Sequence, residues 1–413
     1  METVTLRVDE PREILALIPH QLGFQPRDSA VVVSLRGPRN QVGMLARTDL
    51  PDLADVRDGP QVARTLLAHL GRDGARRTML VLYTDRDPRP RADGDGGDPT
   101  GLHPAWAADR HLHEAVGRSL RLLGTWVVTP RGYLDLHCTG PCCPPGGRPL
   151  VELDGTRVGA HMVLRGSAVL GSREELGRIP RAPSDRRQAV ARVRRRWERR
   201  RDVADEPGLT RWRAESVAAW REVVALVRAE ARAHEEPGRP EPACARPVPS
   251  ERVPTEPVSE GTGGAVARRP AGARPWGRLD AALADRRVRD AVLVTLVPGT
   301  GDLAERSVRP GGQDLALGEA VARIVDPAVA VPPPDDVLLH EAVLSRLVAL
   351  GRAGAQAPAL TLLGMLAWWR GDGARARVLL ERALADDAEH GLAQLLMEGL
   401  AAGVPPGWLR RAV

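Results

Sequence analysis

The sequence predicts an α/β fold, in which a mixed β-sheet with packed helices is followed by a helical hairpin, a disordered linker and an all-α C-terminal region. In the first third, short runs of β-branched residues alternate with amphipathic helical patterns, which favours a sheet covered by helices. Residues 237–275 contain nine prolines and almost no large apolar side chains, which predicts an extended linker. The predicted domains are 1–180 (α/β), 181–236 (basic helical hairpin), 237–275 (linker) and 276–413 (helical and tetratricopeptide-like).

The first helix and the first two paired strands carry the start of the α/β domain. Apolar residues recur at helical spacing over residues 14–22, and Gly23 is a natural end for that helix. Pro19 lies inside the pattern, so we expect it to kink the helix or to end it early. Residues 30–33 form an unbroken apolar run, typical of a strand covered on both faces. Residues 42–46 predict a second strand that returns beside it.

The remaining elements of this domain do not form an orderly βαβ series. Further strands are predicted at 3–8, 79–83, 125–129 and 132–137, and helices at 60–71 and 106–123. Residues 156–170 predict a helix followed by a short extended exit. No strand is followed by G-x-G-x-x-G and no P-loop is present, so the sequence does not support a nucleotide site.

The composition narrows the class of protein. All 59 basic residues are arginine, as expected of a very GC-rich genome, so the net charge of +6 is weak evidence for nucleic acid. No apolar run is long enough for a transmembrane helix, and we expect no membrane association and a cytoplasmic location. Four cysteines in 413 residues are not a disulfide scaffold. One of them, Cys244, lies in the predicted linker and has no evident role.

The other three cysteines are clustered directly after a predicted strand. Cys138, Cys142 and Cys143 fall within six positions and follow His137. Thiolates bind zinc strongly, so the cluster predicts a possible zinc site, with His137, His161 or a water as the fourth ligand. The spacing is not C-x-x-C, and adjacent cysteines rarely bind the same ion. Structural or buried free thiols, or a redox-active or disulfide pair, are the alternatives.

Residues 186–201 predict a strongly basic helix with nine arginines and one glutamate. Such a helix could bind phosphates, with Trp197 stacking on a base. Alternatively, Val190 and Trp197 belong to a buried stripe whose flanks are covered by arginine stems. A second helix is predicted at 209–234, where Glu215 could neutralise part of the basic helix in an antiparallel hairpin.

The last third predicts helices, with a pair at 357–369 and 373–385 that has tetratricopeptide-like spacing. Small residues occupy the positions where two such helices cross closely, with Ala388 replacing the usual closing proline. The small residues are Gly364, Gly371, Ala376 and Ala383. One repeat cannot bury its faces alone, so it must pack on other helices or on a partner protein.

Several segments resemble those of a family of uncharacterised actinobacterial proteins known only as a domain of unknown function (domain of unknown function 4192). The resemblance is carried by Gly23-Phe24, Pro26, Asp28-Ser29 and Val31 to Gly37, by Cys138–Pro145, by Ser172–Leu176 and by the LAWWRGDGARA segment from Leu366. It covers most of the chain apart from the linker. The resemblance implies no particular activity.

Three classes of function follow from these patterns. The sequence favours an interaction or regulatory protein that binds a protein partner through its C-terminal helices. The alternative is a metal-dependent enzyme of unknown reaction, with the cysteine cluster near a cleft beside Asp28 and Ser29. Binding of nucleic acid by helix 186–201 is the least favoured, because no known recognition motif is present. No catalytic residue is identified, since no Ser-His-Asp order, carboxylate pair or H-E-x-x-H helix occurs.

Overall fold

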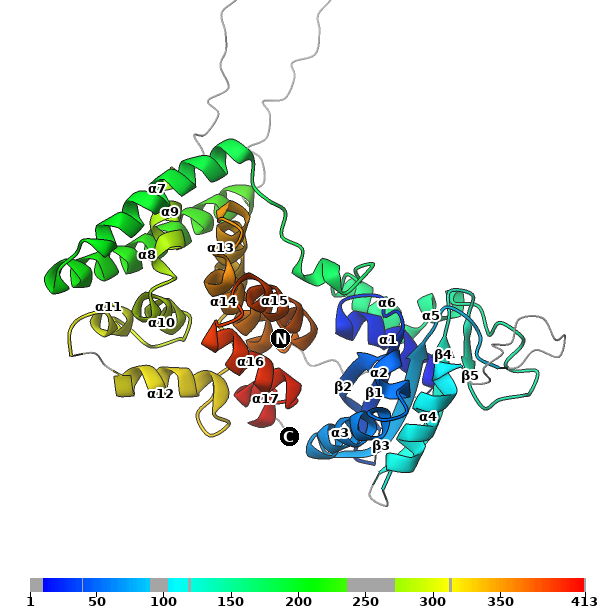
Figure 1. Ribbon diagram of the computed structural model, residues 1–413. Helices are drawn as coiled ribbons and strands as arrows, with labels where there is room; N and C mark the ends of the chain where they lie inside the picture. Colours follow the sequence, from blue (N-terminus) through cyan, green and yellow to red (C-terminus); the bar gives the residue numbers. More distant parts are fainter. Residues whose placement is uncertain are drawn as a thin grey trace, which may run out of the picture. The chain divides into compact units, whose positions relative to one another are not determined.

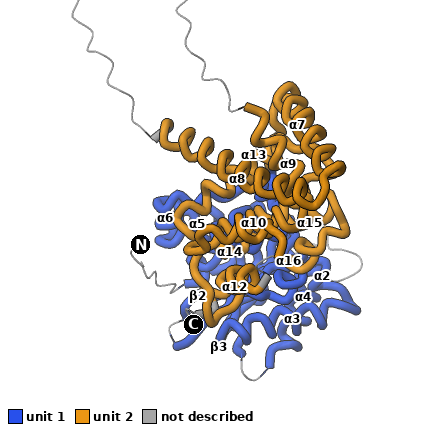
Figure 2. Tube along the Cα trace, turned by 90° about the vertical axis from the view of Figure 1, so that its left-hand side faces the viewer, with its two compact units in different colours: residues 1–178, 372–378, 398–404 blue, residues 179–371, 379–397, 405–413 orange. Residues whose placement is uncertain are grey.

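The computed structural model describes residues 10–38, 40–89, 103–117, 120–235, 272–311 and 314–411. The contacts within the chain divide it into two compact units (Figure 2). Unit 1 comprises residues 1–178, 372–378 and 398–404, and unit 2 comprises 179–371, 379–397 and 405–413. No described helix has both the length and the apolar character needed to cross a lipid bilayer.

Unit 1 contains a five-stranded mixed sheet in the order β2-β1-β3-β4-β5, which confirms the predicted α/β class (Figure 1). The strands are β1 (Ser29–Arg36), β2 (Gln41–Asp49), β3 (Ala75–Tyr83), β4 (Arg121–Val128) and β5 (Tyr133–Asp135). β1 is antiparallel to both of its neighbours, β3 and β4 are parallel, and β5 closes the edge antiparallel to β4. A parallel pair needs a crossover, which the chain provides through α4 (Pro104–Ala115).

Helices cover both faces of the sheet. α1 (Pro11–Leu22) packs on one face, where it also contacts α5 (Val151–Asp154) and α6 (Arg157–Leu164). α2 (Leu50–Ala54), α3 (Gly59–Arg72) and α4 cover the other face. Along β1, Val31 and Val33 point toward α1, whereas Ala30 and Val32 point toward α2–α4. This alternation explains why the run is apolar without interruption.

α1 continues past Pro19 to Leu22, so the proline does not end it early, and Gly23 ends it as predicted, in a left-handed conformation at φ 77°. One boundary in unit 1 differs from the prediction. α4 ends at Ala115, because residues 121–123, which were predicted to be helical, form the start of β4. Leu122 and Leu123 have a helix-like spacing with Leu120, but pairing with β3 decides their conformation. The predicted strand 3–8 lies outside the described residues.

Unit 2 is helical. It begins after the short 3₁₀ turn η1 (Glu174–Gly177) of unit 1. Its first helices are α7 (Ser184–Asp202), α8 (Glu206–Glu235), α9 (Ala273–Ala282), α10 (Arg286–Thr295), α11 (Leu303–Ser307) and α12 (Asp314–Val325). They are followed by α13 (Val337–Leu350), α14 (Ala357–Trp369), α15 (Gly373–Asp386), α16 (Gly391–Ala401) and α17 (Gly407–Arg411). The start of α15, up to residue 378, and the end of α16, from residue 398, are assigned to unit 1. The predicted helical pair therefore corresponds to α14 and α15, while a tetratricopeptide-like role for it stays a prediction.

The two long helices α7 and α8 pack against α9, so the basic hairpin and the start of the C-terminal region lie together in unit 2. α9 begins at Ala273, so residues 273–275 are helical and not part of a linker as predicted. Residues 237–271 of the predicted linker, which include Cys244, lie outside the described residues. The domain boundaries that the sequence suggests stay a prediction.

Indole rings fix the contact between α7 and α8. Trp197 is 5% exposed and stacks on Trp212 with ring centroids 6.0 Å apart. Its Nε1 donates to Ser216 Oγ at 3.1 Å, and Trp212 Nε1 donates to the Trp197 carbonyl at 3.0 Å. The suggestion that Trp197 could stack on a base is therefore wrong, because its ring is enclosed by the hairpin. Arg200 pairs with Glu215 as expected.

The central position of β3 leads to a first prediction. Leu80 is fully buried between β1 and the helices α2–α4, so Leu80→Ala should lower the free energy of unfolding by about 2–5 kcal/mol. Leu164→Ala, at an 86% exposed position of α6, is the matched control and should change it by no more than about 0.5 kcal/mol. Urea unfolding followed by circular dichroism measures both. Equal effects of the two substitutions would contradict the assignment of this core.

A second prediction concerns Asp280 in unit 2, whose pKa is raised to about 6 because burial disfavours its charge, with Arg194 opposing the shift. Between pH about 4 and about 6, the carboxyl group is therefore protonated in the folded protein but ionised in the unfolded chain. Stability should therefore fall as pH rises from about 4 to about 6, by on the order of 2–3 kcal/mol. Asp280→Asn should remove this part of the pH dependence in urea unfolding. The same slope in both proteins would show that the carboxyl group is not desolvated.

Candidate metal centre

The three clustered cysteines lie on a closed loop that leaves and rejoins the edge strand β5. Tyr133 exchanges two backbone hydrogen bonds with Arg148, at 2.8 and 2.9 Å, so residues 134–147 form a loop with paired ends. Gly147 has a φ of 88°, and a Cβ there would lie 2.8 Å from the Tyr133 carbonyl oxygen. Only glycine allows the backbone to approach β5 this closely.

Arg89, which follows β3, holds the loop from outside. Its guanidinium donates to the carbonyl oxygens of Cys138 and Cys143, both at 3.0 Å, and to that of Pro144 at 2.9 Å. Asp87 fixes the guanidinium through two hydrogen bonds and also accepts one from Gly146 N. Although burial opposes the shift, the hydrogen bond from Arg89 lowers the pKa of Asp87. The ion pair therefore persists as an anchor for the cysteine loop.

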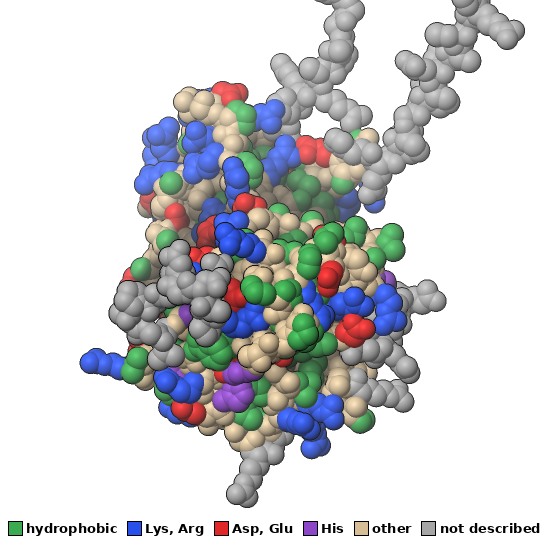
Figure 3. All heavy atoms as spheres, turned by 90° about the vertical axis from the view of Figure 1, so that its right-hand side faces the viewer, with side chains coloured by type: hydrophobic (Ala, Val, Ile, Leu, Met, Phe, Trp, Pro, Cys, Tyr) green, Lys and Arg blue, Asp and Glu red, His purple; other side chains and the backbone are tan. Residues whose placement is uncertain are grey.

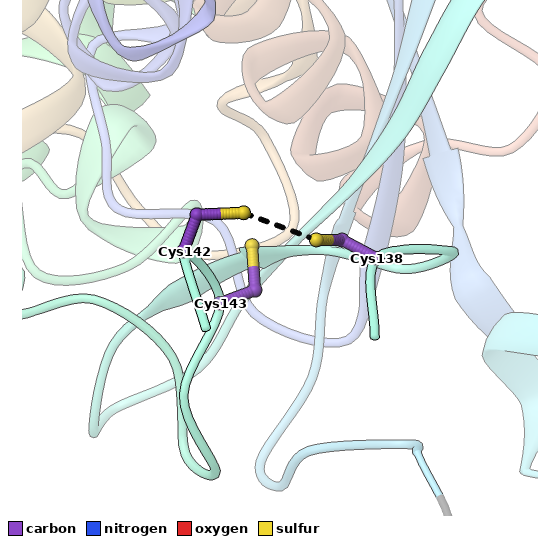
Figure 4. Close-up of side chains that lie close together, drawn as sticks. All are labelled: Cys138, Cys142 and Cys143. Atoms are coloured by element: carbon purple, nitrogen blue, oxygen red, sulfur yellow. Dashed lines mark hydrogen bonds between the residues drawn. The ribbon is translucent and has the colours of Figure 1, made fainter. Parts of the chain in front are cut away.

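The loop brings the three sulfur atoms together, as Figure 4 shows. The Sγ atoms of Cys138 and Cys142 are 3.3 Å apart, and all three sulfurs lie within 4.8 Å of one another. Cys142 is exposed, Cys138 is half-buried, and Cys143 is buried against the core between the sheet and α2–α4. A Cβ at Gly140 would lie 3.7 Å from two of the sulfurs, so the absence of a side chain there leaves the cluster uncovered.

The three thiols are not chemically equivalent. Hydrogen bonds from the Cys142 thiol and from the Gly140 backbone lower the pKa of Cys138. Burial raises the pKa of Cys143. Arg89 lies close enough to both Cys138 and Cys143 to interact with their thiolates electrostatically. The cluster thus combines one thiol with a lowered pKa, one with a raised pKa, and the guanidinium of Arg89 beside them.

His137, the predicted neighbour ligand, points elsewhere in this structure. Its Nε2 lies 3.0 Å from Asp109 Oδ2, and its ring packs edge-on against Trp106. His161 lies on α6. Among the described residues, no histidine, aspartate or glutamate has a ligand atom close to all three sulfurs. Two of the three options for a fourth ligand therefore lack support, and a water or another exogenous group remains.

The polar elbow before β1 does not join this cluster. Ser29 is fully buried, donates to the Arg27 carbonyl at 2.5 Å and accepts from the Arg47 guanidinium at 2.8 Å. Asp28 has a φ of 42°, and its carbonyl accepts from Leu50 N. These contacts fix the entry to β1 and the link from β2 to α2, which agrees with strand capping.

Sequence reasoning did not identify Arg89, Asp87 and Gly147 as parts of the site. Arg89 and Asp87 lie in a run of Asp, Arg and Pro that has the composition of a surface loop. The Pro-Pro-Gly-Gly segment after Cys143 has the composition of a tight turn. What it could not indicate was that this turn approaches β5, because that approach depends on the strand pairing.

The Arg89 anchor leads to a third prediction. Arg89→Met removes the hydrogen bonds from the guanidinium to three carbonyl oxygens, each worth about 1.5–3 kcal/mol for a charged donor. Loss of even one should raise the rate at which the buried Cys143 is alkylated by about 10- to 100-fold in metal-free protein. Peptide mapping of iodoacetamide adducts gives this rate. Arg86→Met, at an exposed position three residues earlier, is the control. An unchanged rate of Cys143 alkylation in Arg89→Met would rule out the anchoring role.

Comparison with known proteins adds a family but no activity. No curated protein and no solved structure matches the chain. One family model, described as a domain of unknown function (DUF4192), matches residues 11–407, which takes in the cysteine loop and nearly all elements of both units. The match confirms the resemblance suggested by the motifs. The chain therefore belongs to the DUF4192 family.

Proposed function

We propose that the protein is a zinc-binding protein whose metal centre is formed by Cys138, Cys142 and Cys143. The observation that carries this proposal is the convergence of three thiol sulfurs within 4.8 Å of one another. Zinc binds cysteine sulfur at about 2.3 Å, so tetrahedral sulfur ligands lie about 3.8 Å apart. The 3.3 Å between Cys138 and Cys142 sulfurs needs to open by only about 0.5 Å to reach this value.

The surroundings of the sulfurs suit a thiolate–metal centre. Three thiolates and one divalent cation carry a net negative charge, and Arg89 offers a nearby positive charge that is already fixed by Asp87. Arg148 donates through Nε to the Cys142 carbonyl at 2.6 Å and adds a second guanidinium at the loop. These contacts hold the backbone of the ligands in place before a metal arrives, which reduces the ordering cost of binding.

The proposed centre has three protein ligands and a fourth position for an exogenous one. Structural zinc sites are usually closed by four protein ligands, whereas sites that exchange ligands keep one position open. Because Cys142 is exposed, solvent or a small ligand could reach this position. The arrangement thus supports the metal-dependent alternative, with zinc available to bind and polarise a small ligand.

A role in protein interaction, predicted from the C-terminal helices, has less support from the described contacts. α14 is buried along almost its whole length, so its side chains are used in packing. Leu315 on α12, Leu338 on α13 and Leu395 on α16 are 81%, 57% and 64% exposed, and they lie on three different helices. The interaction role therefore stays a prediction, as does a role of α7 in nucleic-acid binding.

Zinc binding is tested on the full chain, purified under reducing conditions. The wild type should hold about one zinc per chain at the thiolate centre, and Co²⁺ in its place should give the near-ultraviolet charge-transfer absorption of cobalt–thiolate bonds. Cys142→Ser should abolish that absorption and weaken zinc binding by at least about 100-fold, since it removes one of three protein ligands. Cys244→Ser removes a cysteine far along the sequence from the cluster and is the matched control. A wild type without cobalt–thiolate absorption, or an unaffected Cys142→Ser variant, would refute the proposal.

A further inference from the structure

A second group of metal-ligand side chains lies where the helix that precedes β4 meets the segment that follows β5. Asp109 and His113 both come from α4, and His137 comes from the segment directly after β5. One ligand atom from each of these residues lies within 4.8 Å of the others. His137 Nε2 is 3.0 Å from Asp109 Oδ2, and His113 Nδ1 is 3.2 Å from Asp109 Oδ1. None of these atoms belongs to the cysteine centre.

The fold positions this group through short-range contacts. Asp109 and His113 are four residues apart, so they lie on one face of α4. Backbone pairing of Leu136 with Thr125 brings the next residue, His137, over the same face. The rings of His113 and His137 are nearly perpendicular, at 82°, with centroids 5.8 Å apart. The two rings do not stack on each other, and each has one nitrogen atom close to the Asp109 carboxylate.

The carboxylate of Asp109 is buried, and a hydrogen bond from β4 fixes its position. Its side chain is 7% exposed, while those of His113 and His137 are about half exposed, at 51% and 49%. The buried Thr125 hydroxyl donates to Asp109 Oδ1 from β4. Within the described part of the chain, its ion-pair partners are these two histidines, without an arginine. A buried carboxylate needs a positive charge beside it, and a bound cation can provide that charge.

The ligand atoms are close enough for one ion to reach all three residues. Two ligand atoms that each lie about 2.0–2.2 Å from an ion are about 2.8–3.6 Å apart at angles of 90–110°. The two histidines lie 3.0 and 3.2 Å from different oxygens of Asp109, and His113 Nδ1 also lies 3.1 Å from the Asp109 backbone carbonyl, so a metal would replace these hydrogen bonds. Two imidazoles and one carboxylate favour first-row transition ions over calcium or magnesium, which prefer oxygen ligands alone. The hydrogen bond from Thr125 is the kind of outer contact that orients a ligating carboxylate.

We propose that Asp109, His113 and His137 form a second metal site, for a divalent first-row transition ion such as Zn²⁺ or Co²⁺, separate from the thiolate centre. The half-exposed histidines leave the remaining coordination positions open to water or to a small ligand. This site rests on different residues from the zinc centre proposed above and does not depend on it. If both sites exist, the sequence neighbours His137 and Cys138 serve two different ions.

The test is a Co²⁺ titration of the metal-free full chain under reducing conditions, followed by absorption and equilibrium dialysis. The wild type should bind about two Co²⁺ ions, one with cobalt–thiolate absorption and one with visible d–d bands only. His113→Gln should lose the second ion and keep the thiolate absorption, whereas Cys142→Ser should show the reverse. His161→Gln, at a partly exposed position of α6, is the matched control and should keep both.

Thr125→Val distinguishes a metal site from a hydrogen-bonded cluster. It keeps the shape of the buried side chain and removes the hydrogen bond to Asp109, so it should weaken the second ion by about 10- to 100-fold. If His113→Gln and the wild type bind the same number of ions with the same affinity, the second site does not exist. If the wild type binds one Co²⁺ ion without cobalt–thiolate absorption, the zinc centre is refuted. The second site is then still supported.

Discussion

The burial of β1 on both of its faces is the constraint on which unit 1 depends. β1 is hydrogen-bonded to β2 on one side and to β3 on the other, and its side chains alternate between two separate cores. A strand in this position tolerates few polar residues, so helices must be present on both faces. α1 supplies one cover, and the α2–α4 group supplies the other. The parallel β3–β4 pair then places α4 beside the edge strand, where both groups of potential ligands lie.

Both proposed metal sites lie around β5, the shortest strand of the sheet. A short edge strand leaves backbone groups unpaired, and the chain satisfies part of them through the Tyr133–Arg148 bridge. The loop closed by this bridge carries the cysteines, of which Cys143 packs in the core between the sheet and α2–α4, while His137 turns toward Asp109 on α4. A single chain reversal at the sheet edge thus separates a sulfur-rich group from a nitrogen- and oxygen-rich group. Soft and harder metal-ligand chemistry can coexist there because the two groups share no ligand.

Arginine acts here mainly as a structural residue. Arg89 binds carbonyl oxygens and Asp87, and Arg200 pairs with Glu215 next to the Trp197–Trp212 stack. Arginine side chains are conspicuous at the top of the face drawn in Figure 3, and lower on that face basic and acidic side chains are interspersed. A protein that uses arginine for every cationic role needs it for packing and anchoring as well as for charge. The excess of basic residues is therefore poor evidence for a polyanionic partner.

The sequence by itself determined the α/β class, the buried character of β1, the helical last third and the three cysteines as a group, because each depends on local periodicity or proximity along the chain. Only the tertiary structure decided that His137 faces Asp109 and His113, that Arg89 holds the cysteine loop and that Trp197 is enclosed by α8. Those contacts join residues 15 to 55 positions apart, and strand pairing and helix packing bring them together. The end of α4 was mispredicted for the same reason, since pairing with β3 outweighs the helical spacing of residues 120–123.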